Sequence, residues 1–418
     1  MIFTRVLLLI FILLSFAIAS GEACLEGLPI QKIEIQGLER TDEKVILREL
    51  SFQEGSLYAD TAIKNTVRRL ESLDLFADIQ VSCKPNANAQ ILTFQITEIF
   101  PFIPAPAGKK TDQDGWMLGG ALAYLNVLGQ DIRAEFQYRT SVSPWFESNE
   151  FAIYVSSPWF FDLPVGFNLE ILRTDSYDEL RNYDAASWLL DLDLTWNFKK
   201  PYALLTSLAY RHLDDFGSVP EAGIGFSVDR RDAPLDSRLG VYEEFKITGV
   251  GFLFDSEESY VEYLVDLRAY YTIKKFISGA SALFRYRAGD VSFFDRLHHG
   301  GANTFRGYEA DSSRYGKNEL LLNFEERFIL VERRPFSIQG INLFYGIQLV
   351  GGLDGSLLFN ASNPKMKDFS GAIYGGIHFL IPALERLRIE VGYSPDKKEP
   401  KIFVGLYEKN VAARWRSR

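Results

Sequence analysis

From about residue 99 to residue 410 the sequence alternates between apolar and polar side chains with a period of two. Residues 131–140 show the pattern clearly, with apolar side chains at alternate positions: Ile132, Ala134, Phe136 and Tyr138. Segments 187–196 and 386–394 repeat it. Because successive side chains of a β-strand point to opposite faces, each segment is predicted to be a two-faced strand of about ten residues.

The lengths of the connections indicate which face is inside. A soluble sandwich buries its apolar face, whereas a membrane barrel turns that face toward lipid. Short turns and longer loops alternate along this chain, as expected for strands that run up and down between a periplasmic and an external rim. The predicted short turns are residues 126–130, 158–164, 199–201, 230–237, 274–277, 332–336 and 382–385. The predicted longer loops include residues 141–148, 175–186, 214–221, 289–316 and 354–368. We therefore predict an all-β transmembrane barrel of about 16 antiparallel strands over residues 99–410.

The first predicted barrel strand, residues 99–106, contains three prolines: Pro101, Pro104 and Pro106. Proline has no amide hydrogen and cannot donate to a ladder. If this strand closes the barrel against the last strand, residues 401–407, the seam between them is expected to be only partly hydrogen-bonded. The other interpretation is that the proline segment is a linker and that the barrel closes elsewhere.

The N-terminus is predicted to be a signal peptide, residues 1–19, with a positive flank, an apolar run and the cleavage site Ala17-Ile18-Ala19. Cleavage after Ala23 is one alternative, and lipidation at Cys24 is another. The mature chain is therefore expected to be exported. Its two cysteines, Cys24 and Cys83, either form a disulfide in an oxidising compartment or remain free thiols.

Composition narrows the class of protein further. Outside the N-terminus no apolar run reaches the length of about 18 residues that a membrane helix needs, which excludes a helical membrane protein but not a barrel. The formal net charge of -10 and the pI near 5.2 argue against a nucleic-acid partner.

Residues 28–98 have a different pattern, which predicts a small α+β domain. A short alternating strand, residues 30–36, comes first. Thr41 is the predicted N-cap of a helix that runs to about Leu50. Asp60 is predicted to cap a second helix, whose apolar side chains share one face: Ile63, Val67 and Leu70.

Two strands, residues 76–83 and 91–97, complete the small domain, with a turn at residues 84–89. The order strand, helix, helix, strand, strand resembles a polypeptide-transport-associated (POTRA) domain, and the alternative is a generic α+β domain. The resemblance implies a periplasmic docking module that adds a client strand to an exposed sheet edge.

The loop at residues 289–316 has Phe305-Arg306-Gly307-Tyr308 at its centre. A guanidinium group inside a membrane barrel needs a carboxylate, because an unpaired buried charge is costly. Two acidic residues on later strands, Glu325 and Asp354, fall on the polar face. We predict that the loop folds inward and that Arg306 pairs with one of them.

Taken together, these features resemble the family of outer-membrane proteins that assemble or translocate polypeptides, in which POTRA domains precede a 16-stranded barrel. An arginine-glycine-aromatic tip on the sixth external loop is the hallmark of that family, and Arg306, Gly307 and Tyr308 match it. The resemblance implies that Glu325 and Asp354 anchor this tip.

A second family signature lies at a periplasmic turn. Asp229, Arg231 and Asp232, followed by Gly240, resemble it. The sequence departs from the family at its end, where a basic tail, residues 411–418, follows the last strand in place of a terminal aromatic residue.

The resemblance implies a barrel in the outer membrane, an N-terminal domain in the periplasm, and unfolded or secreted client polypeptides as partners, with periplasmic or lipoprotein subunits as accessory partners. The POTRA domain would capture a client strand, the seam would open, and the anchored loop would hold the lumen in its working shape. A passive channel for small solutes is the main alternative, and a lipid-transfer or attachment protein is a third.

Other clusters of polar residues have simpler explanations than catalysis or metal binding. His298 and His299 are adjacent, point in different directions on an extended chain, and have no nearby cysteine or acidic cluster in the sequence. Asp191 and Asp193 share a face that is predicted to be solvated in the lumen. No nucleophile-base arrangement or phosphate-binding loop is present, so we expect neither an enzyme nor a cofactor.

Overall fold

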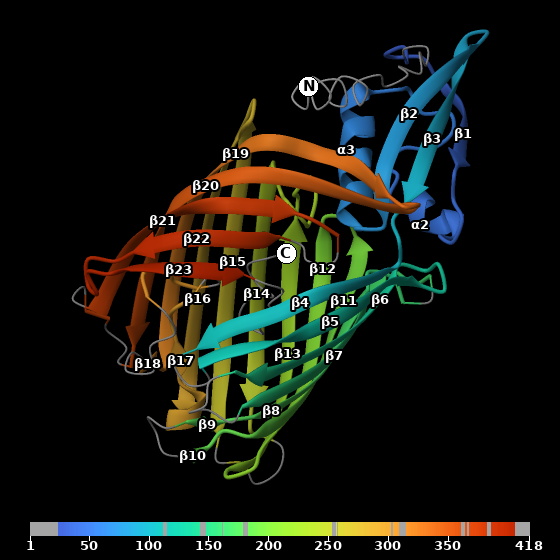
Figure 1. Ribbon diagram of the computed structural model, residues 1–418. Coiled ribbons are helices and arrows are strands. Elements are labelled where there is room, and N and C mark those ends of the chain that lie inside the picture. The colour runs from blue at the N-terminus through green and yellow to red at the C-terminus, as the bar shows by residue number, and fades with distance from the viewer. Residues whose placement is uncertain are drawn as a thin grey trace.

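The computed structural model contains a small N-terminal α+β domain and a large β-barrel (Figure 1). It describes residues 24–111, 115–142, 148–160, 162–178, 183–252, 256, 258–301, 304–308, 315–360, 364–365, 368–382 and 386–405. The predicted signal peptide, residues 1–19, and the predicted tail, residues 411–418, lie outside the described residues.

The N-terminal domain has the predicted order of elements: β1 (Ile30–Gln36), α2 (Glu43–Leu47), α3 (Asp60–Ser72), β2 (Phe76–Asn86) and β3 (Ala89–Glu98). The order in its sheet is β1-β3-β2, with β1 parallel and β2 antiparallel to β3. The predicted apolar face of α3 packs on this sheet and forms the domain core with it.

The first helix is shorter than predicted, ending at Leu47, and its predicted N-cap is wrong, because Thr41 makes other contacts. Its backbone N–H donates to Glu98 Oε1 (2.8 Å), and its hydroxyl accepts from Asn126 Nδ2 of the barrel (2.8 Å). Asp42 is the N-cap instead, since its side chain accepts from the N–H of Lys44. The predicted cap at Asp60 is also wrong: α3 begins at this residue, and no side chain caps the helix.

The barrel is a 16-stranded antiparallel sheet, as the sequence predicts. Its strands are β4 (Phe102–Thr111), β5 (Gly115–Val127), β6 (Ile132–Ser141), β7 (Asn149–Ser157), β8 (Val165–Asp175), β11 (Ser187–Lys199), β12 (Tyr202–Leu213), β13 (Gly217–Asp229), β14 (Gly240–Val250), β15 (Ser259–Ile273), β16 (Phe276–Asp290), β19 (Asn318–Ile338), β20 (Ile341–Phe359), β21 (Phe369–Leu380), β22 (Leu387–Tyr393) and β23 (Pro400–Gly405). Short elements occupy the external loops: β9 (Tyr177–Asp178), β10 (Tyr183–Asp184), η1 (Phe293–Asp295), β17 (Leu297–His298) and β18 (Tyr315–Gly316).

Apolar side chains face outward and polar side chains face the lumen. Phe136 and Trp188 each keep 47% of their surface exposed, whereas Gln137 and Arg139 keep 1%. This distribution is that of a membrane barrel and the reverse of a soluble sandwich. Among the helices that the structure describes, none has the length and apolar character needed to cross a membrane.

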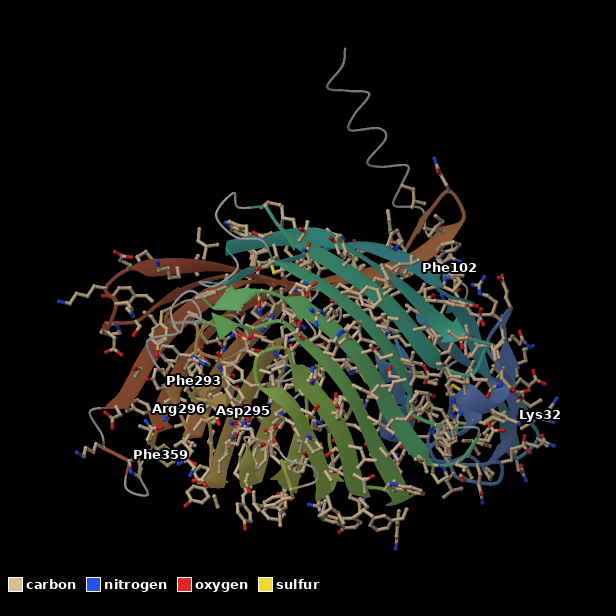
Figure 2. All side chains as sticks on the ribbon, turned by 90° about the horizontal axis from the view of Figure 1, so that it is seen from below. Lys32, Phe102, Phe293, Asp295, Arg296 and Phe359 are labelled. Carbon is tan, nitrogen blue, oxygen red and sulfur yellow. A yellow bond between two sulfur atoms is a disulfide. The ribbon has the colours of Figure 1, made fainter. Side chains whose placement is uncertain are left out.

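The two ends of the barrel differ. In Figure 2, Lys32 of the N-terminal domain lies at one end, while Phe293, Asp295 and Arg296 of the loop after β16 lie at the opposite end. The N-terminal domain therefore covers the end of the short turns, and the long loop lies at the other end.

Three predicted connections are wrong. The predicted loop at residues 354–368 begins later, because β20 continues to Phe359. Residues 332–336 were predicted to form a turn, but β19 continues through them and turns only at Gln339 and Gly340. The β19–β20 hairpin is therefore long enough to reach the N-terminal domain (Figure 1). The predicted loop at residues 214–221 is also shorter, because β13 begins at Gly217 and pairs with β12 from that residue.

The seam of the barrel lies between β4 and β23, which are the two end strands of the sheet order and lie next to each other. Pro104 and Pro106 are part of β4 and pair in register with β5, so they lie in a strand and not in a linker, although this strand begins at Phe102, after Pro101, and not at the predicted residue 99. Within the described residues no ladder joins β4 to β23.

The two prolines act on one side of β4. Leu125 N–H donates to Pro101 O (2.8 Å), so residue 101 and every second residue after it direct their backbone groups toward β5. Pro104 and Pro106 belong to the alternate set of residues, whose backbone groups point away from β5. The two missing amide hydrogens are therefore on the edge that faces β23.

Candidate functional site

The candidate site is the tip of the loop between β16 and β19, where Phe305, Arg306 and Tyr308 are buried. The tip is tightly packed. The ring centres of Phe305 and Tyr308 are 4.7 Å apart, and both side chains pack with Ala372 of β21. A Cβ at Gly307 would lie 2.2 Å from Phe305 Cε1 and 2.7 Å from Ser394 Cβ, so only glycine fits there.

Arg306 is held by carboxylates from three later strands. Its Nε and Nη2 donate to the two oxygens of Asp354 at 2.8 Å each, and its backbone N–H donates to Asp354 Oδ2 (2.9 Å). Its Nη1 donates to Glu390 Oε1 (3.1 Å) and lies 3.7 Å from Glu325 Oε2. The guanidinium carbon is 3.3 Å from the centre of the Tyr374 ring. A bidentate, charge-assisted pair of this kind fixes both the position and the orientation of the loop tip.

The structure thus brings together the arginine and both predicted acidic residues, with Asp354 as the primary partner and Glu325 at ion-pair distance. The sequence prediction missed Glu390, which is fully buried on β22. The signal was present, because Glu390 is on the polar parity of segment 386–394. It also missed Gly392, where a Cβ would lie 1.7 Å from Arg306 O, so the loop backbone approaches β22 only because this residue is glycine.

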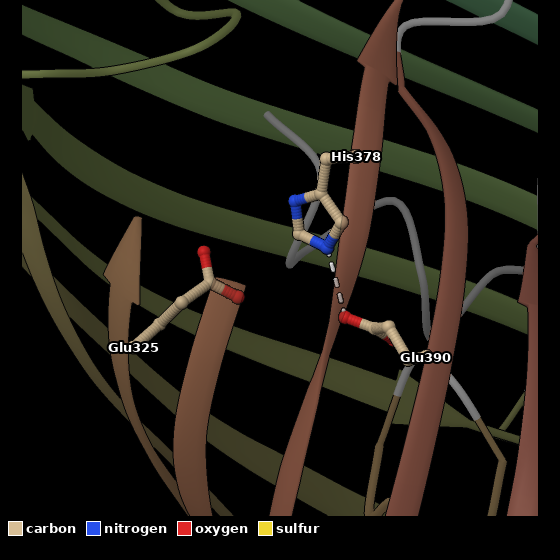
Figure 3. Close-up of side chains that lie close together, drawn as sticks. All are labelled: Glu325, His378 and Glu390. Atoms are coloured by element: carbon tan, nitrogen blue, oxygen red, sulfur yellow. Dashed lines mark hydrogen bonds and ion pairs between the residues drawn. The ribbon is translucent and has the colours of Figure 1, made fainter. Parts of the chain in front are cut away.

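Glu325, His378 and Glu390 form the one group of potential metal ligands found among the described residues, with ligand atoms within 4.8 Å of one another. Figure 3 shows His378 Nε2 at hydrogen-bonding distance from Glu390 Oε1 (2.9 Å), with the Glu325 carboxylate facing the pair. The guanidinium of Arg306 already lies against both acidic residues. A divalent cation there would be repelled by this charge, so the arrangement favours an arginine site over a metal site.

The two histidines of the loop have separate environments. His299 is buried, and its ring contacts Glu319 (Nε2 to Oε2, 2.7 Å) and the hydroxyl of Ser356. His298 pairs with Tyr315 in the short β17–β18 ladder. Neither belongs to the group of potential metal ligands that the structure contains.

The predicted signature at the periplasmic turn is an ordered turn between β13 and β14. Arg231 makes a bidentate pair with Asp229 (2.9 and 2.7 Å). Asp232 Oδ1 accepts the backbone N–H groups of Arg238 (2.9 Å) and Leu239 (3.1 Å). Gly240 has a φ of 107°, and a Cβ there would lie 2.1 Å from Arg230 O. The turn therefore requires glycine at this position.

The two cysteines, whose pairing the sequence left open, form a disulfide with a Cα–Cα distance of 5.0 Å. It ties the segment before β1 to β2. It lies in the N-terminal domain and is not part of the loop site.

Comparisons with known proteins agree with this geometry. Residues 28–99 match the POTRA family described as a surface antigen variable number repeat, and residues 126–321 match the Omp85 superfamily domain. No curated protein sequence matches the chain.

Solved structures with a similar fold include two proteins called CdiB and one called BamA. CdiB from Escherichia coli has a TM-score of 0.55 at 14% identity, covering 94% of this chain and 92% of that one. CdiB from Acinetobacter baumannii has a TM-score of 0.53 at 14% identity, covering 90% and 72%. BamA from Haemophilus ducreyi, lacking POTRA domains 1–3, has a TM-score of 0.50 at 12% identity, covering 90% and 83%. At these identities the likeness is one of fold.

Proposed function

Because the chain belongs to the Omp85 superfamily of outer-membrane proteins, with its barrel in the outer membrane and its POTRA domain in the periplasm, we propose that it assembles or translocates other polypeptides. We place the POTRA domain at residues 28–98 and propose that it captures a client strand. The client then passes through or beside the seam of the barrel, residues 99–410. The family assignment favours this role over an enzymatic one.

The observation that carries this proposal is the anchored loop inside the barrel. A passive channel for small solutes needs an open lumen. Here the loop tip is buried in the barrel and held by Asp354, Glu390 and Glu325. The loop thus favours a role at the wall of the barrel, where the edges of β4 and β23 share no ladder in the part of the chain that the structure describes.

The edges of the POTRA sheet differ in how open they are. The start of β1 is covered, because Ile30 N–H donates to Ser56 O (2.9 Å) and Gly55 N–H donates to Ile30 O (2.7 Å). On the described part of the chain β2 forms a ladder with β3 alone, although the barrel contacts its first residue, where Arg333 donates to Phe76 O. We therefore assign client capture to the outer edge of β2.

The test uses the full chain in cells, with a photoreactive amino acid in place of Gln80 on β2 and, as the control, of Lys32 on β1; both positions are exposed. We expect newly exported outer-membrane polypeptides to crosslink at position 80 more strongly than at position 32. Equal or absent crosslinking at both positions would overturn client capture at this edge.

Arg306→Ala tests the role of the anchor. It removes the guanidinium group from the buried carboxylates of Asp354 and Glu390 and from the partly buried carboxylate of Glu325, a change that costs about 3–5 kcal/mol at buried pairs. We expect a folded, membrane-inserted barrel whose delivery of the crosslinked clients falls on the order of tenfold, with Arg306→Lys intermediate because it keeps the charge and loses the bidentate geometry. A passive channel would show higher conductance and no client defect. A pull-down from crosslinked outer membranes would identify clients and accessory subunits.

A further inference from the structure

Asp236, in the turn between β13 and β14, contacts more cationic side chains than any one carboxylate of the loop site. Its Oδ1 accepts from Arg327 Nη1 (2.7 Å), Gln348 Nε2 (2.9 Å) and Arg386 Nη2 (3.1 Å), and its Oδ2 lies 3.3 Å from Arg238 Nε. A periplasmic turn thus reaches side chains of β19 and β20, two strands that border the loop site. The formation of the turn itself does not require these contacts with distant strands.

The same turn is bound by the POTRA domain. Arg68 of α3 donates from Nη2 to Asp236 O (2.7 Å) and from Nε to Asp232 Oδ2 (3.3 Å). Its Nη2 is also 3.9 Å from Asp236 Oδ2. Arg68 therefore fixes both the backbone and an acidic side chain of the turn to α3.

Glu325 connects the Asp236 cluster to the loop tip. Its Oε1 faces Arg327 Nε (3.3 Å) and Arg386 Nη1 (3.9 Å), while its Oε2 faces Arg306 Nη1 (3.7 Å). Among the described residues, Asp236 and Glu325 each lie within ion-pair distance of both Arg327 and Arg386. Both arginines therefore share Glu325 with Arg306.

We propose that Asp236 is a positioning residue that couples the docking of the POTRA domain to the anchoring of Arg306. While Arg68 holds the turn in place, Asp236 neutralises Arg327 and Arg386, and Glu325 remains available to Arg306. When α3 moves away from the barrel, Arg68 no longer holds the turn, and the side chain of Asp236 moves away from Arg327 and Arg386. Arg327 and Arg386 then draw Glu325 toward themselves, because buried guanidinium groups need a carboxylate.

This inference deepens the proposed function, on which its biological meaning rests: client binding on the POTRA domain would loosen the loop inside the barrel. The test of this coupling measures the effect of a change at the POTRA contact on the loop tip. Coupling between two sites is also reciprocal, which supplies a second measurement.

The experiment measures hydrogen-deuterium exchange of the full chain in lipid nanodiscs, without any client. The readout is the peptide that contains the Arg306 amide, which donates to Asp354. We expect Arg68→Gln and Asp236→Asn each to speed its exchange by about threefold or more. The matched control is Lys44→Gln, which removes a different POTRA–barrel ion pair, Lys44 to Asp162 (2.9 Å), away from the Asp236 cluster.

The reciprocal measurement uses Arg306→Lys, for which we expect faster exchange in α3. The coupling is overturned if Arg68→Gln leaves the Arg306 amide as protected as in the parent chain, or if Lys44→Gln has an equal effect. Should Asp236→Asn fail to insert, Arg68→Gln decides alone, since it alters only the contact with α3. Because no client is present, this result is independent of crosslinking at position 80, which tests the proposed function separately.

Discussion

Asp131 is an acidic residue whose environment opposes ionisation. It lies in the turn between β5 and β6 and is 9% exposed. Burial raises the pKa of Asp131 to about 8, more than the neighbouring guanidinium of Arg48 lowers it. The group keeps its proton in the folded protein at a pH where the unfolded chain has lost it, since an unfolded aspartate has a pKa near 3.9. This difference stabilises the fold most below the unfolded pKa, and the advantage is lost as the pH rises toward 8.

We therefore predict that the parent chain loses stability between about pH 4 and pH 8 and that Asp131→Asn removes this part of the dependence. At pH 9 the variant should be more stable by roughly 1–3 kcal/mol, because it has no charge to bury. Asparagine also tolerates the φ of 58° at this position. Urea unfolding in detergent micelles, followed by tryptophan fluorescence at pH 5 and pH 9, measures both values. An equal free energy of unfolding for the two chains at pH 9 would contradict the prediction.

At the scale of elements, the β19–β20 hairpin is a barrel segment that completes the core of the POTRA domain. Phe344 of β20 is 5% exposed and belongs to the same buried cluster as the POTRA side chains. Arg333 of β19 lies over the Phe344 ring, with its guanidinium carbon 3.5 Å from the ring centre. It donates to Glu71 O at the end of α3 (2.6 Å) and to Phe76 O at the start of β2. The hairpin thus fixes the domain against the barrel.

Phe344→Ala should release this contact, because removing a buried phenylalanine costs about 3–5 kcal/mol. We expect faster hydrogen-deuterium exchange throughout α3 and β2, with the barrel strands unchanged. The matched control is Phe336→Ala in the same hairpin, whose side chain is 46% exposed and which should have little effect. If the two variants behave alike, the hairpin does not depend on Phe344 for docking.

At the scale of the whole molecule, the barrel is continuous everywhere except at one seam. Every neighbouring pair from β4 round to β23 forms a ladder, whereas these two end strands do not pair in the described residues. Pro104 and Pro106 remove donors from the edge of β4 that faces β23. Pro101 is on the opposite parity, where its carbonyl accepts from Leu125.

Replacing Pro104 and Pro106 together with alanine should restore two donors at the seam. Each new hydrogen bond is expected to add about 0.5–1.5 kcal/mol, which should raise the temperature at which the barrel unfolds on gel electrophoresis. Under the proposed function, client delivery should fall at the same time. Pro101→Ala is the control, because its new amide would face β5. A seam variant that keeps the parent's thermal stability and delivery would show that the prolines do not weaken the seam.

The sequence alone determined the features that depend on local alternation. The alternation of apolar and polar side chains over residues 99–410 specifies two-faced strands. Glu325 and Asp354, the predicted partners of Arg306, occupy polar positions of this alternation and therefore point toward the lumen. The three-dimensional structure decided what depends on register and distant packing. Glu390 contacts Arg306 although the two residues are 84 positions apart in the sequence. The β19–β20 hairpin extends to the POTRA domain, and Asp236 contacts arginines from several elements. A local pattern says which way a side chain points, but only the shear of the closed barrel and the docking of the domain set which side chains meet.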